Sequence, residues 1–436
     1  MASHSHHSSL FALCILAAAL TRPASAATYR VVSYMTGQTQ APIGIVEVLP
    51  AVFYSDSGNL VFSISSLGAM TILVSFSDPP YILESAPGVT ASNGLFYTSI
   101  EQVATGGGTG NIISMPLGTG SPQTYPAQGF AMTPLAGNLP DGKLFGLVYG
   151  FSNASENLGT TDLSGNVTTF YQFPSTDRPA TPIYGTDGNY YGTAFTYGAS
   201  NGYFYKVTPS GSFTKVATLP FQGEGIALQG TDGNFYGVQG PGCSTGAQHS
   251  AVYKMTPSGQ FTTLHDFGLC GNATITSLIE GSDGKLYGAT QGNSVLFSLT
   301  KSGTYKVEFE TTNGTTQGLC TCILTQGSDG SIYGTALGGG PGGFGLVFAL
   351  DAGLPVPKPR ARKFFPDSGT AGTRVRIWGS NLFGASVTFN GTPGTKIYNS
   401  GLNYVWTTVP AGATTGPITV TTPGGTSTTH GSFTVN

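Results

Sequence analysis

Few residues of this chain have side chains that could do chemistry, and four of its twenty carboxylates belong to a repeated acidic motif. The motif is written GTDGNYYG from Gly185, GTDGNFYG from Gly230, GSDGKLYG from Gly281 and GSDGSIYG from Gly327. Calcium needs six to eight oxygen ligands, usually from several carboxylates, and each copy offers one aspartate. The Asp-Gly pair instead suits the positive-φ positions of a tight hairpin turn. We therefore interpret the motif as a turn and predict no metal or other cofactor.

Other groups suited to catalysis are scattered along the sequence. Arg178, Glu224 and His249 are the candidates for a lyase or hydrolase acting on extracellular polysaccharide, because catalysis needs placed acids and bases. Gly-x-Ser-x-Gly occurs around Ser200 and Ser244. A nucleophile elbow lies at a strand-to-helix turn, however, and no helix is expected after either serine. Scattered charges of this kind are more often solvated, so we favour a protein without catalysis and keep the enzyme as the alternative.

Aromatic and polar residues in the same irregular segments form the candidate ligand-binding set. Exposed aromatic rings often mark binding surfaces and could stack on sugar rings. For each ring taken singly, packing in the core is an equally good explanation. The set comprises Phe195, Tyr197, Tyr203, Glu224, His249 and Phe344.

The N-terminal residues predict export. An apolar run from Leu10 to Leu20 precedes Ala24-Ser25-Ala26, a small-x-small cleavage pattern, so residues 1–26 are expected to be a signal peptide. No second apolar segment approaches the ~20 residues that a membrane span needs. We expect a secreted monomer without a transmembrane anchor.

Export determines how the cysteines are interpreted. Cys14 would leave with the signal peptide, so four of the five cysteines remain. Cysteines in an oxidising compartment favour disulfides, and four cysteines allow three connectivities. The favoured bridge is Cys243–Cys270, whereas the pairing of Cys320 and Cys322 is left open.

The acidic motif recurs with a regular period. Successive copies are 45 to 51 residues apart, and a second motif follows, such as YKVTPSGSFT from Tyr205 or YKMTPSGQFT from Tyr253. Periods of about 40–50 residues with four strands each are typical of a β-propeller. Around Gly233 we predict strands over 226–229, 234–238, 252–255 and 261–267.

The predicted fold is therefore all-β, with a seven-bladed β-propeller whose last blade is completed by the N-terminal strand from Thr28. Six or eight blades are the alternatives. The pairs Phe235-Tyr236 and Leu286-Tyr287 place apolar residues on both faces of the second strand. A strand with one wet face would alternate, so we expect each blade to be covered on both sides. Both recurring turns should lie on one face of the propeller, and the irregular loops on the other should carry the site.

Charge divides the chain into two parts. Residues 27–354 hold 9 basic and 19 acidic side chains, a net charge of −10, whereas residues 355–436 hold 7 basic and 1 acidic, a net charge of +6. The stretch GLPVPKPRARKFFP between them indicates an extended linker. We predict a propeller over 27–354, a linker over 355–363 and a second domain over 364–436. The acidic propeller argues against nucleic acid, while the basic linker could bind an anionic envelope polymer or dock against the propeller.

The paired motifs GSDGxxYGT and VYKxTPSGxxTTL resemble the tandem repeats of secreted bacterial proteins of the choice-of-anchor class, over roughly residues 45–354. That resemblance implies export and surface association, with no established reaction. The C-terminal stretch FFPDSGTAGTRVRIWGSNLFGASVTFNGTPGT, followed by VPAGATTGPITVTTPGG, resembles an IPT/TIG domain, which implies an immunoglobulin-like sandwich that serves as an extracellular accessory module. The matching positions are Pro366, Ser368, Gly369, Gly372, Val375, Ile377, Gly379, Asn381, Phe389, Gly391 and Pro410.

Three hypotheses about function follow. We favour an exported or cell-surface binding or adhesion protein whose propeller loops recognise a glycan or a surface protein. The alternative is an extracellular propeller enzyme, a polysaccharide lyase or hydrolase. The third hypothesis is a structural component of the cell envelope.

Overall fold

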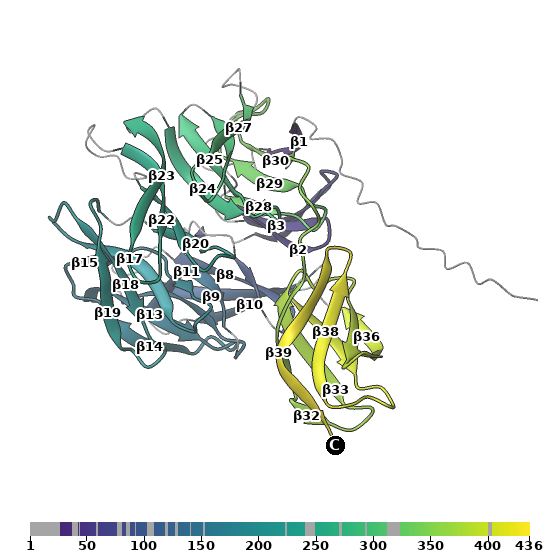
Figure 1. Ribbon diagram of the computed structural model, residues 1–436. Helices are drawn as coiled ribbons and strands as arrows, with labels where there is room; N and C mark the ends of the chain where they lie inside the picture. The colour runs from purple at the N-terminus through teal and green to yellow at the C-terminus, as the bar shows by residue number, and fades with distance from the viewer. Residues whose placement is uncertain are drawn as a thin grey trace, which may run out of the picture.

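The regular secondary structure of the described residues is entirely β-strand (Figure 1). The computed structural model describes residues 27–436 except for 37–41, 43, 58–59, 76–80, 84–87, 92, 103–108, 118–120, 127–129, 140, 151–152, 223–224, 240–248, 270–272, 293, 312–322 and 400–402. Within that part of the chain the strand pairs are antiparallel apart from one, between β32 (Ser368–Gly369) and β39 (Gly425–Val435). The all-β prediction is confirmed.

From residue 28 to 351 the chain forms consecutive sheets of four or five strands. The first three sheets contain β2 (Ile45–Leu49), β3 (Val52–Ser57), β4 (Leu60–Ser65) and β5 (Met70–Ser75); β6 (Tyr81–Leu83), β7 (Val89–Thr90), β8 (Leu95–Gln102), β9 (Thr109–Pro116) and β10 (Gln123–Pro126); and β11 (Phe130–Asn138), β12 (Leu144–Gly150), β13 (Asn153–Thr161) and β14 (Val167–Gln172). The next three contain β15 (Asp177–Pro179), β16 (Ile183–Tyr184), β17 (Tyr190–Thr196), β18 (Gly202–Val207) and β19 (Phe213–Thr218); β20 (Ile226–Gln229), β21 (Phe235–Gln239), β22 (His249–Met255) and β23 (Phe261–Leu269); and β24 (Ala273–Glu280), β25 (Leu286–Gly292), β26 (Val295–Leu299) and β27 (Tyr305–Glu310). The last contains β28 (Leu324–Gln326), β29 (Ile332–Ala336), β30 (Leu346–Asp351) and β1 (Thr28–Tyr34).

The N-terminal strand completes that last sheet. Its strand order is β1-β30-β29-β28, and β1 runs antiparallel to β30 with Thr28 opposite Asp351. Tyr29 of β1 stacks on Phe309 of the neighbouring sheet, with the ring centroids 4.0 Å apart. The predicted pairing of the two distant segments is therefore confirmed.

Apolar side chains fill the spaces between successive sheets. In β17, Tyr190 packs toward the preceding sheet, and Tyr191 packs on Phe235 of the following one. At the end of the series, Tyr333 of β29 packs on Phe53 of β3, with the ring centroids 4.2 Å apart. Clusters of this kind join each sheet to the next and the last to the first, so adjacent apolar residues serve two interfaces, as expected. We call β1 to β30 the ring.

The C-terminal strands form two sheets that face each other across their own core. One has the order β31-β33-β37-β36 and the other β32-β39-β38-β34-β35. The strands introduced here are β31 (Arg360–Phe365), β33 (Arg374–Ser380), β34 (Ser386–Phe389), β35 (Thr392–Pro393), β36 (Thr395–Asn399), β37 (Tyr404–Thr408) and β38 (Gly416–Thr422). Val375, Ile377 and Phe389, three of the positions matched to the IPT/TIG pattern, lie in this core. We call β31 to β39 the sandwich.

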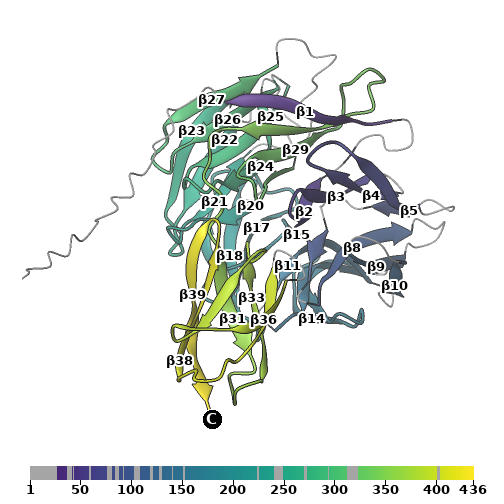
Figure 2. The same ribbon diagram turned by 90° about the vertical axis from the view of Figure 1, so that its right-hand side faces the viewer.

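The sandwich lies against the face of the ring that carries the Asp-Gly turns, which we call the turn face (Figure 2). Asn403 Nδ2 donates to the Thr90 carbonyl at 3.2 Å, and Ser282 Oγ donates to the carbonyl of Pro355 in the linker. The Tyr404 hydroxyl lies 2.1 Å from where a Cβ on Gly94 would be. The turn face is therefore the surface through which the ring contacts the linker and the sandwich.

Candidate functional site

The aspartates of the repeated motif are used within their own turns. Asp232 Oδ1 accepts from the backbone N–H of Asn234 at 3.3 Å, and its Oδ2 accepts from the Tyr236 hydroxyl at 2.7 Å. The corresponding tyrosine bonds are 2.8 to 3.0 Å long and reach Asp187, Asp283 and Asp329. The glycine that follows has a positive φ, +82° at Gly233, as a hairpin turn requires. The interpretation of the motif as a turn is confirmed.

The residue before each aspartate joins neighbouring sheets, a role that the sequence did not reveal. Thr231 donates its backbone N–H and its hydroxyl to Glu280, at 2.8 and 2.6 Å, and Glu280 ends a strand of the next sheet. Equivalent contacts pair Thr186 with Gln229, Ser282 with Gln326 and Ser328 with Glu47. The last of these connects the final sheet to the first. We call these four contacts the inter-sheet joints.

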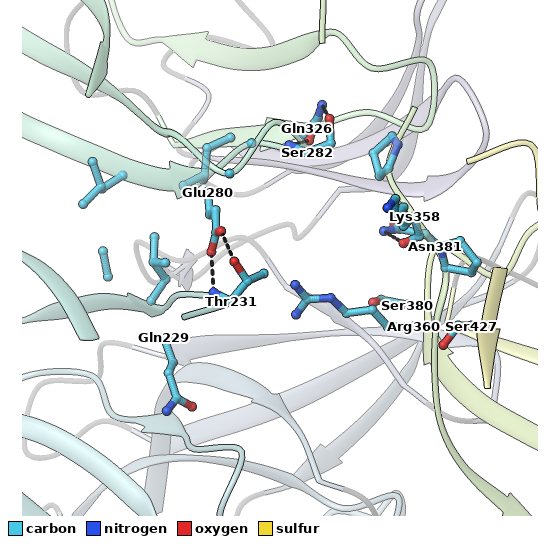
Figure 3. Close-up of a pocket in the computed structure, with 18 of the residues that line it drawn as sticks. Gln229, Thr231, Glu280, Ser282, Gln326, Lys358, Arg360, Ser380, Asn381 and Ser427 are labelled. Atoms are coloured by element: carbon cyan, nitrogen blue, oxygen red, sulfur yellow. Dashed lines mark hydrogen bonds between the residues drawn. The ribbon is translucent and has the colours of Figure 1, made fainter. Parts of the chain in front are cut away.

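A cavity of about 580 Å³ lies between the turn face and the sandwich (Figure 3). Its ring wall includes the joint residues Gln229, Thr231, Glu280 and Gln326. Its other wall comes from the linker and the sandwich and includes Lys358, Arg360, Asn381 and Ser427. We call this cavity the ring–sandwich cleft, and it is the candidate site that the geometry supports best.

The polar groups of the ring wall already have partners. Besides its bonds from Thr231, Glu280 Oε1 accepts from Lys301 Nζ at 2.6 Å, so the carboxylate is paired with a cation. Gln326 accepts from the Ser282 N–H at 2.9 Å and donates to the Gly330 carbonyl at 3.0 Å. Lys301 also lies 3.6 Å from Asp232, so one cation serves both carboxylates and offsets part of the negative charge of this wall.

The two cations of the opposite wall, unlike the polar groups of the ring wall, lack side-chain partners in the described part of the chain. The side chains of Lys358 and Arg360 form no hydrogen bond or ion pair with any residue that the structure describes. Arg360 points across the cleft toward Thr231 (Figure 3). The linker thus approaches the ring through backbone and neutral contacts, and the two charges stay available within the cleft.

Arg178, a catalytic candidate from the sequence, lies on the inner strand β15 opposite Phe195. Its Nη1 donates to the carbonyls of Ser175 and Asp177, at 2.9 and 3.0 Å. Tyr197, which follows β17, has 78% of its surface exposed. The exposed Tyr197 ring is therefore accessible for stacking on a ligand. Part of the Arg178 guanidinium, in contrast, is occupied by hydrogen bonds to carbonyls of neighbouring residues.

Tyr203 does not fit the ligand-stacking role expected of it. It is only 7% exposed, and its hydroxyl donates to Asp177 Oδ2. Thr196 donates to the other oxygen of Asp177 at 2.8 Å. Burial, together with the bond to Asp177, raises the pKa of the Tyr203 hydroxyl. The ring is a buried partner of a buried carboxylate, which the sequence pattern could not distinguish from an exposed aromatic.

The other candidates are dispersed. His249 Nδ1 contacts both oxygens of Asp266 at 2.8 and 2.9 Å, and among the described residues no hydrogen bond or ion pair joins His249 to Arg178. Phe344 is 36% exposed just before β30. Glu224 and the cysteines Cys243, Cys270, Cys320 and Cys322 lie outside the described residues, so the catalytic set and the disulfide stay predictions.

Glu156 of β13 is a group that the sequence did not single out. Burial raises the pKa of its carboxyl to about 7, and the nearby Arg178 charge opposes this effect. A carboxyl that titrates near neutral pH suits proton transfer, and such perturbed groups gather at functional sites. Its surroundings come from separate sheets, so no local sequence signal could have identified it.

Metal ligands and membrane spans were sought in the part of the chain that the structure describes. No group of three or more His, Cys, Asp or Glu side chains there is placed to hold a metal ion. None of its segments forms a helix with the length and apolar character needed to cross a bilayer.

No protein-family model and no curated protein matches the chain. Among solved structures, a streptogramin B lyase has a TM-score of 0.50 at 14% identity, and the alignment covers 75% of this chain and 98% of that one. Virginiamycin B lyase from Staphylococcus aureus has a TM-score of 0.51 at 16% identity, with 74% and 98% covered. Both are β-propeller proteins, and at this identity the likeness shows the fold alone. The ring is therefore a β-propeller, while the choice-of-anchor and IPT/TIG resemblances stay predictions.

Proposed function

We propose that this chain is an exported or cell-surface binding protein without catalysis, and that a glycan occupies its ring–sandwich cleft. The cleft supports this proposal because its volume of about 580 Å³ falls within the range of ligand sites, roughly 300–1,000 Å³. Its lining is rich in hydroxyl, amide and charged side chains, which suit the hydroxyl groups of sugars. The proposed site thus lies on the turn face, opposite the loop face favoured by the sequence.

The proposal extends to the architecture. We infer a seven-bladed propeller closed by β1 and an IPT/TIG-type sandwich, supported by the series of sheets and by the core positions Val375, Ile377 and Phe389. Of the linker predicted over 355–363, residues 360–363 belong to β31, so we infer that the linker ends at residue 359. A signal peptide over residues 1–26, an extracellular or envelope location and the Cys243–Cys270 bridge belong to the same proposal.

A glycan-array screen of residues 27–436, followed by calorimetry on the strongest ligand, tests the function. Thr426 lines the cleft, whereas Thr428, two residues along the same strand, does not. Thr426→Trp should block binding, and Thr428→Trp should leave it unchanged. Equal binding by both variants would place the site elsewhere, and the absence of binding to any glycan would refute the proposal.

An extracellular polysaccharide lyase or hydrolase is the second candidate, and Glu156 is the observation that favours it. If Glu156 acts as a base, activity should rise with pH through about 7, and Glu156→Gln should lower kcat about 100-fold or more. Cleavage that persists in Glu156→Gln with an unchanged pH profile would remove this candidate.

A further inference from the structure

We infer that the ring–sandwich cleft selects an anionic glycan, one bearing carboxylate or sulfate groups, and that Arg360 and Lys358 bind those groups. This inference rests on the proposed glycan-binding function and specifies the ligand class. It assigns to these two charges a binding role within a defined cavity.

The charges of the lining carry the argument. The ring wall contributes one carboxylate, Glu280, and that group is held by Thr231 and by Lys301 at 2.6 Å. The opposite wall contributes the Lys358 ammonium and the Arg360 guanidinium, without partners among the described residues. Lys301 is shared between Glu280 and Asp232, at 2.6 and 3.6 Å, so these three groups leave one negative charge on the ring side. Lys358 and Arg360 add two positive charges, which gives the cleft an excess of positive charge. An anion is the ligand that this excess attracts.

The backbone that carries the two cations is fixed. Asn381 Nδ2 donates to the Lys358 carbonyl at 3.0 Å, and the Ala361 N–H donates to Ser427 Oγ at 3.0 Å. Arg360 pairs with Ser380 as β31 joins β33. The main chain beside both cations is thus held in place, and only their side chains remain to be ordered by a ligand. This arrangement lowers the conformational entropy that is lost on binding.

The chemistry of the groups defines what fits. A guanidinium offers five donors in a planar fork that matches the paired oxygens of a carboxylate or sulfate, and such charge-assisted bonds are about twice as strong as neutral ones. Carboxylate and sulfate both present such paired oxygens, so we infer an oxyanion ligand of either kind. The amide of Asn381 and the hydroxyl of Ser427 lie beside the cations for contact with neutral parts of the sugar.

Calorimetry on residues 27–436 tests the inference with three probes of the same galactose ring configuration: galacturonic acid oligomers, sulfated galactose oligomers and neutral galactose oligomers. At least one acidic probe should bind at least tenfold more tightly than the neutral one, and its affinity should fall as salt rises. Arg360→Gln should weaken acidic binding at least tenfold, and Lys358→Gln should weaken it less. Lys254→Gln, an equal charge loss on β22 away from the cleft lining, should leave binding unchanged.

The outcomes separate the inference from the proposed function. Preference for one acidic probe, or for both, supports the inference and identifies the anion. Neutral and acidic probes that bind alike, with no effect of Arg360→Gln, would overturn the inference and leave glycan binding intact. Failure of all three probes and of a broad glycan array would overturn both. Unchanged thermal unfolding of Arg360→Gln would show that a lost affinity is not a folding defect.

Discussion

At the scale of single residues, burial decides what each carboxylate of this protein does. Asp232 is stabilised by its own turn, and Asp177 by Tyr203 and Thr196. Asp56 of β3 is different because it is 3% exposed and neither of its oxygens has a partner among the described residues. Burial raises the pKa of Asp56 to about 7.

The pH dependence of stability follows from that shift. Because the pKa of Asp56 in the folded state lies above its ordinary value of 3.8, the folded state holds the proton more tightly than the unfolded state. The stability that the protonated group contributes is full below about pH 4 and is lost as the pH rises through about 7.

We expect Asp56→Asn to raise the free energy of unfolding at pH 8 by roughly 4 kcal/mol, because a tenfold change in proton affinity corresponds to about 1.4 kcal/mol. At pH 4 the substitution should have little effect. Urea unfolding from pH 4 to pH 8 measures both values, with Asp367→Asn at an exposed position as the control. An identical pH profile for wild type and Asp56→Asn would contradict this account.

At the scale of elements, the inter-sheet joints explain the hydroxyl side chains of Thr231 and Ser328, which donate to carboxylates of neighbouring sheets. The turn and the strands could be predicted from local pattern, and the strand predicted over 226–229 coincides with β20. The joints could not, because Thr231 and Glu280 are 49 positions apart and Ser328 and Glu47 are 281 apart. Local spacing carries no information about a partner on another sheet.

Ser328→Ala tests the joint that connects the last sheet to the first. Ser328 donates its N–H and its hydroxyl to Glu47 at 2.7 and 2.8 Å, and Glu47 is 8% exposed. Loss of the hydroxyl should lower the free energy of unfolding by about 1–3 kcal/mol, because a buried carboxylate loses a donor.

Thr186→Ala is the matched control for that joint, because only the backbone N–H of Thr186 is seen to donate to Gln229. It should change the free energy of unfolding by less than about 0.5 kcal/mol. Equal losses in Ser328→Ala and Thr186→Ala, measured by urea unfolding, would show that the hydroxyl bond to Glu47 contributes nothing.

At the scale of the whole molecule, the cleft exists because the sandwich docks on the turn face. The sequence predicted two parts with a basic linker between them, and it favoured the loop face for function. Docking depends on surface fit between residues far apart, such as Asn403 and Thr90, and no repeat pattern encodes that fit.

Gly94→Ala should loosen this docking. A Cβ on Gly94, at φ +83°, would lie 2.1 Å from the Tyr404 hydroxyl, whereas Gly284, at φ +82°, has nothing within 4 Å of that position. Both alanine variants carry the same backbone strain, about 1–2 kcal/mol. Gly94→Ala alone should accelerate tryptic cleavage after Arg360 and expand the molecule in solution scattering. Matching cleavage rates would argue that the Tyr404 contact does not hold the sandwich.

The pairing of β1 with β30 also constrains when the protein can fold. During synthesis β1 emerges before β30, which follows only after more than 300 further residues, since Thr28 lies opposite Asp351. Such a distant contact is slow to form, and until then the open edge of β30 is exposed to other chains. The same pairing makes the finished protein hard to unravel from either end, because neither terminus of the ring can leave without breaking a complete strand ladder. Slow maturation and long persistence would therefore have a common origin.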